Sequence, residues 1–259
     1  MGKEEEIVDM IVNGPKNYLR NVSVDNVIFG YHQKELKVLL QRPRGIAKWM
    51  LPGGYIKRTE TIDEAAKRIA KDRTGLDKLF LKQFLAFGSP SRIKDPSFTP
   101  KILSTLNELQ IDEDHWMFDY FVSVCFYTLT EFSLVTPNGA LYAEECQWWG
   151  IENIPPMLYD HGEMIEEALK ALRLHIYHYP IGYELLPQKF TLPEIHTLYE
   201  TILGKKLDSR NFSKKLMATG IIKKLDEQRN IGAHRAPYLY IFDKEVYDNA
   251  LKEGLALII

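Results

Sequence analysis

Aliphatic and aromatic residues gather in five short segments of the first 151 residues. β-Branched and aromatic residues favour extended backbone, and polar or glycine-rich stretches separate the segments. The first two segments are joined by a polar turn at residues 32–35, which predicts a β-hairpin. The five predicted strands are residues 22–29, 36–40, 79–87, 118–129 and 145–151.

The clearest predicted helix follows a glycine-containing loop at residues 51–54. Thr61 and Glu64 predict a capping box at its start, because each side chain can bond the backbone amide of the other residue. Gly75 suits the left-handed position that ends a helix. The apolar face, at helical spacing, consists of Ile62, Ala65, Ala66, Ile69 and Ala70. A later helix has its inner face at Met164, Ile165, Ala168, Leu169 and Leu172.

Two other segments have a mixed pattern. Residues 1–20 form an acidic, partly amphipathic lead-in, which the Asn-Gly-Pro sequence at residues 13–15 is expected to break. Residues 97–116, here called the inserted segment, predict a helix with apolar positions at Ile102, Leu103, Leu106 and Leu109. A lid beside a pocket and a packing element without a functional role are equally good interpretations of this segment.

The pattern changes after Pro180, which indicates a second domain. A helix is expected from near Thr191 to residue 203, and a second from residue 209 to 219, each followed by a glycine. Phe212 and Leu216 are one turn apart and are expected to pack inward. Two predicted strands follow, at residues 221–226 and 237–242. This is the order of elements in a winged helix-turn-helix domain, with the basic helix second.

Basic residues concentrate in this second domain. Between residues 205 and 235, nine basic and three acidic residues give a net charge of +6, whereas the whole chain has −2. Such segregation is expected where DNA phosphates supply most of the affinity, although a solvated helix can also be lysine-rich. Arg210, Asn211 and Lys214 are the candidates for base-edge or groove contacts. The candidates for phosphate contacts are Lys215, Lys223, Lys224, Arg229 and Arg235.

The composition of the 259-residue chain, 45% apolar with mixed charges, fits a globular protein of one large or two ordinary domains. Cys125 and Cys146 lack CxxC spacing and are expected to be reduced, buried thiols. The acidic N-terminus lacks the features of a signal peptide, and no apolar run approaches the roughly 20 residues of a membrane span. We expect a cytoplasmic protein that has no membrane partner and needs no cofactor.

The loop and helix at residues 54–76 resemble the Nudix box. The matching positions are Gly54, Glu60, Arg68, Gly75 and Leu76. The glutamates that hold magnesium in Nudix hydrolases fall here on Ile69, Asp72 and Arg73. Because Mg²⁺ requires a shell of oxygen ligands, this helix offers a poor metal site. The resemblance therefore implies a Nudix-like scaffold without catalytic or metal-binding residues, and not an enzyme.

A second set of residues resembles one Nudix branch, the Nudix-related bacterial transcriptional regulators. The loop with Arg92, Asp95 and Pro96 resembles a loop of that branch. Residues 181–192, 198–200, 202–204, 208–212 and 234–235 resemble its winged helix in order and spacing. The resemblance covers most of residues 20–245. It implies a homodimer that binds double-stranded operator DNA and senses a sugar or ADP-ribose. The Arg92 loop favours the sugar-responsive members, and therefore a role in carbohydrate metabolism.

We therefore predict an α+β protein, with a Nudix-like α/β/α sandwich at residues 1–178 and a winged helix at residues 179–259. The residues expected to line the effector pocket are Arg42, Trp49, Glu60, Arg73 and Arg92. One alternative is a Nudix pyrophosphohydrolase acting on ADP-ribose or a related nucleoside diphosphate, with a metal site assembled from Glu60, Asp72 and Glu144 or Glu145. Another is a sugar-nucleotide-binding protein whose winged helix binds a protein.

Overall fold

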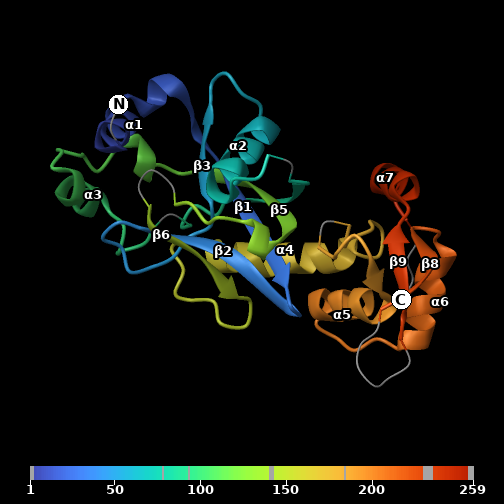
Figure 1. The fold of residues 1–259 in the computed structure, drawn as a ribbon. Helices are drawn as coiled ribbons and strands as arrows, with labels where there is room; N and C mark the ends of the chain where they lie inside the picture. The colour runs from blue at the N-terminus through green and yellow to red at the C-terminus, as the bar shows by residue number, and fades with distance from the viewer. Residues whose placement is uncertain are drawn as a thin grey trace. The chain divides into compact units, whose positions relative to one another are not determined.

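The computed structural model describes residues 3–77, 79–92, 94–139, 143–183, 185–229 and 236–255. The chain forms two compact units (Figure 1). The first unit contains the chain up to Gly30 together with Lys37–Ala168. The second contains Tyr31–Leu36 and the chain from Leu169 onward. No described helix is long and apolar enough to cross a membrane.

A six-stranded sheet forms the centre of the first unit, in the order β4-β5-β1-β2-β6, with β3 paired to β1. Its strands are β1 (Tyr18–His32), β2 (Glu35–Pro43), β3 (Gly53–Lys57), β4 (Lys82–Phe87), β5 (Val122–Glu131) and β6 (Ala143–Gly150). All five predicted strand segments are confirmed, whereas β3 lies in the glycine loop and was not predicted. The turn between β1 and β2 has positive φ at both Gln33 and Lys34, which suits a two-residue hairpin.

Helix α2 (Ile62–Thr74) has both predicted caps. Thr61 and Glu64 form the capping box, and Gly75 is left-handed with φ 74°. Four of the five predicted apolar positions are buried, but the side chain of Ile62 is 38% exposed because it lies in the first turn. Ile69 is 1% exposed and packs with Val24, Ile56 and Phe126 in the core.

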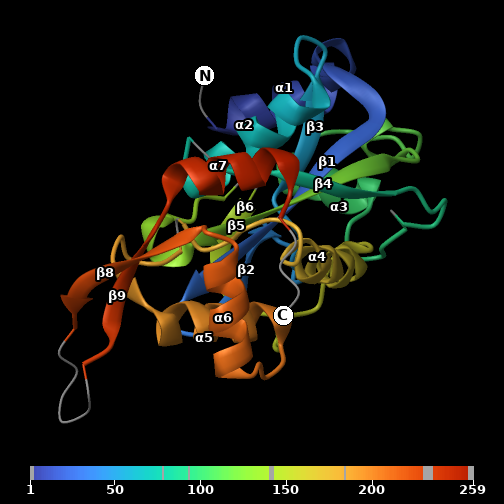
Figure 2. The same cartoon turned by 90° about the vertical axis from the view of Figure 1, so that its right-hand side faces the viewer.

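The second unit contains the helices and hairpin of the predicted winged helix (Figure 2). Its elements are β7 (Phe190–Thr191), α5 (Leu192–Leu203), α6 (Ser209–Ala218), β8 (Ile222–Gln228), β9 (Tyr238–Phe242) and α7 (Lys244–Glu253), and the strands pair in the order β7-β9-β8. Phe212 and Leu216 are buried, as predicted, and the Phe212 ring lies 5.1 Å from that of Tyr199 on α5. The terminal helix α7 was not predicted.

Helix α4 (His161–His175) confirms the predicted helix with its inner face near Met164. Its residues from Leu169 onward belong to the second unit. There the Nε of Arg173 donates to the carbonyl oxygen of Ile202 at 3.0 Å. The tip of the β1–β2 hairpin also belongs to the second unit, where the side chain of Tyr31 hydrogen bonds to Thr201 of α5.

The predicted break at residues 13–15 is wrong, because helix α1 (Lys3–Asn17) continues through Pro15. Proline has no N–H, so the carbonyl of Ile11, four residues earlier, receives no helical bond from it. Two side chains at the end of the inserted segment supply bonds instead. The indole N–H of Trp116 donates to the Ile11 oxygen at 3.1 Å, and the Nε2 of His115 lies 3.0 Å from the same oxygen.

The inserted segment is partly helical. Helix α3 (Pro100–Asn107) is shorter than predicted, because Glu108 takes a left-handed conformation and leaves Leu109 outside the helix. A short 3₁₀ helix, η1 (Trp116–Phe118), follows. Ile11, Leu103 and Ile111 form a buried cluster that attaches the segment to α1.

Gly14 allows Trp116 to approach α1, since a Cβ at this position would overlap the indole ring. We therefore expect Gly14→Ala to lower the free energy of unfolding by about 1–3 kcal/mol, as overpacking does in a filled interior. Chemical denaturation of the full-length protein measures this change. Gly162→Ala is the matched helical control, because its Cβ would lie 3.8 Å from the nearest atom, an ordinary contact. Equal stability of the two variants would contradict the packing account.

Candidate effector cavity and DNA-binding surface

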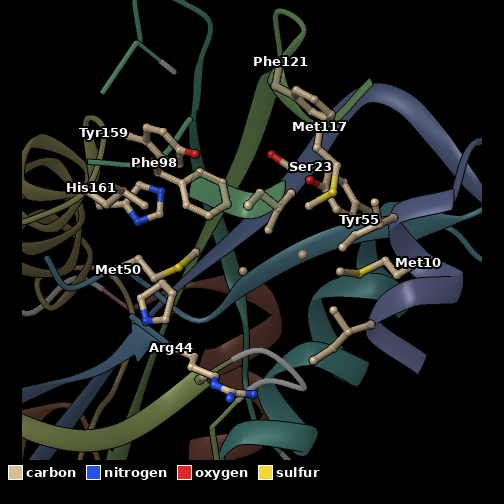
Figure 3. Close-up of a pocket in the computed structure, with 18 of the residues that line it drawn as sticks. Met10, Ser23, Arg44, Met50, Tyr55, Phe98, Met117, Phe121, Tyr159 and His161 are labelled. Atoms are coloured by element: carbon tan, nitrogen blue, oxygen red, sulfur yellow. The ribbon is translucent and has the colours of Figure 1, made fainter. Parts of the chain in front are cut away.

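A cavity of about 420 Å³ lies in the first unit (Figure 3). Its lining comes from α1, β1, β3, the inserted segment, the loop before it and the start of α4. We call four of its polar lining residues the polar floor: Ser23, Asp25, Arg92 and His161. A volume of this size is typical of small-molecule sites.

Asp25 is a nearly buried carboxylate in the middle of β1, with a side chain 7% exposed. One carboxylate oxygen accepts a hydrogen bond from the hydroxyl of Ser123. The other lies 3.9 Å from the Nε2 of His161. A Cβ at residue 53 would overlap the Asp25 carboxylate, so glycine allows β3 to pass beside this group.

His161 begins α4, and its orientation is set by the glycine loop. Its Nδ1 accepts the backbone N–H of Leu51 at 2.9 Å, so the neutral ring carries its proton on Nε2, toward Asp25. Burial lowers the pKa of His161 and outweighs the opposing effect of the Asp25 and Asp160 charges. The floor therefore pairs a carboxyl acceptor, Asp25, with the N–H donor of a neutral imidazole, His161.

Arg92 is held by a two-pronged ion pair with Asp160. The Nε and one terminal nitrogen of Arg92 donate to the two carboxylate oxygens at 2.9 and 3.0 Å. Burial lowers the pKa of Arg92, but the bonds to Asp160 and the charge of Asp25 more than offset it, so the pKa is raised. The guanidinium is charged, and its fork is already occupied.

Asp95, in the same loop, is a structural residue. It pairs with Lys48 at 2.7 Å and accepts the backbone N–H of Ser97 at 2.9 Å. Burial alone would raise the pKa of Asp95, but the bonds from Lys48 and Ser97 outweigh this effect and lower the pKa to about 2. The loop that carries Arg92 is therefore fixed at both ends.

Of the five predicted pocket residues, Arg92 lines the cavity. Arg42 instead pairs with Glu144 at 3.0 Å, and Trp49 is buried with its ring 5.2 Å from that of Trp149. Glu60 pairs with Arg68 at 2.6 Å, which lowers the pKa of Glu60 although burial alone would raise it. Arg73 lies at the end of α2, where its carbonyl accepts the N–H of Asn138.

Neither Asp25 nor His161 is among the pocket residues expected from the sequence. The polar pair Asp25-Asn26 interrupts the apolar run of β1, which is the signal that could have identified the floor. A contact between residues 25 and 161 has no local signature, so the sequence pattern could not pair them.

The magnesium positions of the box take different environments. Ile69 is in the core, with its Cδ1 beneath Gly54, and Asp72 is exposed on the outer face of α2. Among the described residues, no three His, Cys, Asp or Glu side chains gather into a group that could hold a metal ion. Both cysteines are free thiols. Burial raises the pKa of Cys146 to about 11 and that of Cys125 still further.

On the second unit, the side chains of Arg210, Asn211 and Lys214 are exposed on α6. Within the described part of the chain, neither Arg210 nor Lys214 has an ion-pair partner. Lys215 is half-buried at the end of α6. Three other predicted contacts have intramolecular partners: Lys223 pairs with Asp243 at 2.6 Å, Lys224 lies over the Tyr238 ring, and Arg229 pairs with Glu194 at 2.7 Å. Arg235 lies outside the described residues.

Comparison with known families matches each unit separately. Residues 19–168 match the NUDIX domain, and residues 182–242 match the NrtR DNA-binding winged helix domain. The first match spans more than half of the chain, so the protein belongs to the NUDIX family. It is a NUDIX protein with a C-terminal DNA-binding winged helix, which confirms the fold predicted from the sequence.

The chain resembles three known proteins over most of its length. It is 26% identical over 234 residues to the ADPR responsive transcriptional repressor NtrR of Acinetobacter baylyi, covering 88% of this chain and 84% of that protein. Shewanella oneidensis NrtR complexed with a 27mer DNA has 22% identity and a TM-score of 0.67, over 91% of this chain and 100% of the other. A MutT/nudix family protein from Enterococcus faecalis has 19% identity and a TM-score of 0.61, over 93% and 96%. These structures share the fold.

The depressed pKa of His161 predicts a pH-dependent stability. Below the unfolded-state value of 6.5, the unfolded chain takes up a proton at His161 before the folded chain does. This contribution is therefore complete above pH 6.5 and is lost as the pH falls from there toward the folded pKa, by up to about 1.4 kcal/mol per pH unit. His161→Asn keeps an acceptor for the Leu51 N–H but does not titrate.

Chemical denaturation of the wild type and His161→Asn from pH 7.5 to 5 measures the difference between their free energies of unfolding. The contributions of the other titrating groups cancel in this difference. We expect the wild type to lose more stability than the variant below pH 6.5. Parallel pH profiles would contradict the assignment of a neutral, buried His161.

Proposed function

We propose that this protein is a transcriptional regulator in which the NUDIX unit binds a small effector and the winged helix binds operator DNA. The observation that carries the proposal is the presence on one chain of a cavity with a polar floor and of a DNA-binding-type winged helix with exposed Arg210 and Lys214. Helix-turn-helix regulators usually read near-palindromic sites as two-fold dimers, which favours a cytoplasmic homodimer.

The effector is a sugar or an ADP-ribose-like molecule. ADP-ribose is favoured by the relative from Acinetobacter baylyi, which is named as responsive to ADPR. A sugar, and a role in carbohydrate metabolism, is favoured by the loop of Arg92. Both ligands present hydroxylated rings, and Asp25 with His161 offers an acceptor and a donor for such hydroxyls.

We further propose that the NUDIX unit holds its effector intact. Metal-assisted hydrolysis of a diphosphate needs an ion that orients the substrate and stabilises its charge. Ile69 contributes a hydrocarbon to the core and Arg73 a positive charge, while Asp72 is exposed. These three side chains offer the ion one carboxylate, which supports a sensor in preference to a pyrophosphohydrolase.

Two elements can carry a signal from the cavity. β1 bears Asp25 and ends in the hairpin tip, where Tyr31 hydrogen bonds to Thr201. α4 begins with His161 and continues to Arg173, which donates to the carbonyl oxygen of Ile202. Thr201 and Ile202 are neighbours near the end of α5. We propose that a ligand which alters the spacing of Asp25 and His161 biases the winged helix through these two elements.

The proposed DNA contact predicts the effect of charge reversal on α6. Arg210→Glu combined with Lys214→Glu should weaken binding to the DNA upstream of the protein's own gene by at least ~10-fold, because two cations that contact DNA become anions. The salt dependence of binding should also become less steep, because the DNA-facing surface of α6 loses two cations. Fluorescence anisotropy over a range of salt concentrations measures both.

Lys67→Glu, an exposed charge reversal on α2, is the matched control and should bind with nearly wild-type affinity. Unchanged affinity and salt dependence in the α6 variant would favour the alternative in which the winged helix binds a protein.

The sensor proposal predicts ligand binding without metal. Titration calorimetry in EDTA should detect micromolar binding of ADP-ribose or of a pentose, because the described cavity relies on protein side chains alone. No AMP should form from ADP-ribose in Mg²⁺ or Mn²⁺. Release of AMP that is abolished by Asp72→Ala would establish the pyrophosphohydrolase instead. If neither ADP-ribose nor any pentose binds, the sensor proposal is excluded.

A further inference from the structure

One side of the cavity is built by two segments that belong neither to the six-stranded sheet nor to helix α2. α1 precedes the NUDIX match at residues 19–168, and the inserted segment interrupts the path between β4 and β5. Together with Met117, which directly follows the inserted segment, their side chains form what we call the apolar wall: Ile7, Met10 and Ile11 of α1, Leu103 and Leu106 of α3, and Met117 of η1.

Hydrogen bonds and a ring contact hold the apolar wall in place. Pro15 leaves the carbonyl of Ile11 open to side-chain donors, and Trp116 and His115 occupy it. The Trp116 ring also packs against the Tyr55 ring of β3 at a tilt of 53°, with ring centroids 4.5 Å apart, and Tyr55 itself lines the cavity. The wall is thus joined to both α1 and the sheet. These bonds favour the interpretation of the inserted segment as part of a ligand site.

The cavity is divided by polarity. In Figure 3, Met10 and Met117 lie across the cavity from His161. The floor offers a carboxylate acceptor at Asp25 and an N–H donor at His161, whereas the wall offers methyl, methylene and thioether groups. A ligand that is polar along its whole length would bury polar groups against the wall without hydrogen-bond partners, which costs free energy.

The charges of the lining also constrain the ligand. Its cations are Arg44 and Arg92, and its anions are Asp25 and Glu144, so the formal charges balance. The fork of Arg92 is already bonded to Asp160. A phosphate on the floor would meet the buried Asp25 carboxylate, which is a like charge, whereas a pair of ring hydroxyls can donate to Asp25 and accept from His161.

We propose that the cavity binds a glycoside-like ligand, with a hydroxylated sugar ring on Asp25 and His161 and an aromatic or apolar aglycone against Met10, Leu103 and Met117. The inference rests on the proposed function, since it specifies the ligand of the sensing unit. An aromatic aglycone suits the wall because methionine side chains contact aromatic rings favourably. A nucleoside and an aryl glycoside share this chemistry, and the experiment separates them.

The test compares each free pentose with its glycoside, by titration calorimetry on the full-length protein. The pairs are D-ribose with adenosine and L-arabinose with 4-nitrophenyl α-L-arabinofuranoside. We expect at least one glycoside to bind at least ten-fold more tightly than its free sugar. Met10→Asn, which places an amide in the wall, should reduce that ratio to about three-fold or less.

Val12→Asn is the matched control, because Val12 lies on the same helix, is 61% exposed and does not line the cavity. It should retain the wild-type ratio. Thermal melting checks that both variants fold, and Met117→Ala replaces Met10→Asn if that variant does not. Equal affinity for sugar and glycoside, or an equal ratio in the two asparagine variants, would overturn the proposal.

DNA affinity measured in the same variants, with and without ligand, distinguishes failure of the glycoside proposal from failure of the proposed function. If ligands change DNA binding but the aglycone adds nothing, the glycoside proposal fails and the proposed function stands. If neither sugars, glycosides nor ADP-ribose bind, both fail.

Discussion

A largely buried ion pair between Arg92 and Asp160 organises the effector cavity. Their side chains are 4% and 14% exposed, and removing two charges from water is costly unless their hydrogen bonds are made. Here the guanidinium donates through two nitrogens to both carboxylate oxygens. The pair connects the loop after β4 to the start of α4 and thereby places Arg92 and His161 beside Asp25 of β1. The polar floor depends on this connection.

The fold and the cavity use different parts of the chain. The sheet and α2 supply the NUDIX scaffold, in which Ile69 contributes to the core. One side of the cavity is formed by α1 and the inserted segment, which join each other at the Ile11 carbonyl. The scaffold and the apolar wall of the cavity therefore come from different segments of the chain. This division explains why residues expected from the Nudix box, such as Glu60, serve in a structural ion pair.

The fold could be predicted from local patterns because its elements carry their own signals. Examples are the capping box at Thr61, the left-handed Gly75 and the apolar pair Phe212 and Leu216. The site could be predicted only in part. Arg92 came from a resemblance, but Asp25 and His161 are brought together by strand order and helix placement. The continuation of α1 through Pro15 was also unpredictable, since it depends on donors about 100 residues away.

The central claim is that the cavity and the winged helix are linked energetically. Two elements that carry residues of the polar floor, β1 and α4, end in contacts with the last turn of α5. The most direct test measures DNA affinity with and without saturating ligand, and ligand affinity with and without saturating DNA. The account predicts a change of at least about five-fold, equal in both experiments because coupling is reciprocal. Binding of both partners with identical affinities, alone or together, would contradict it.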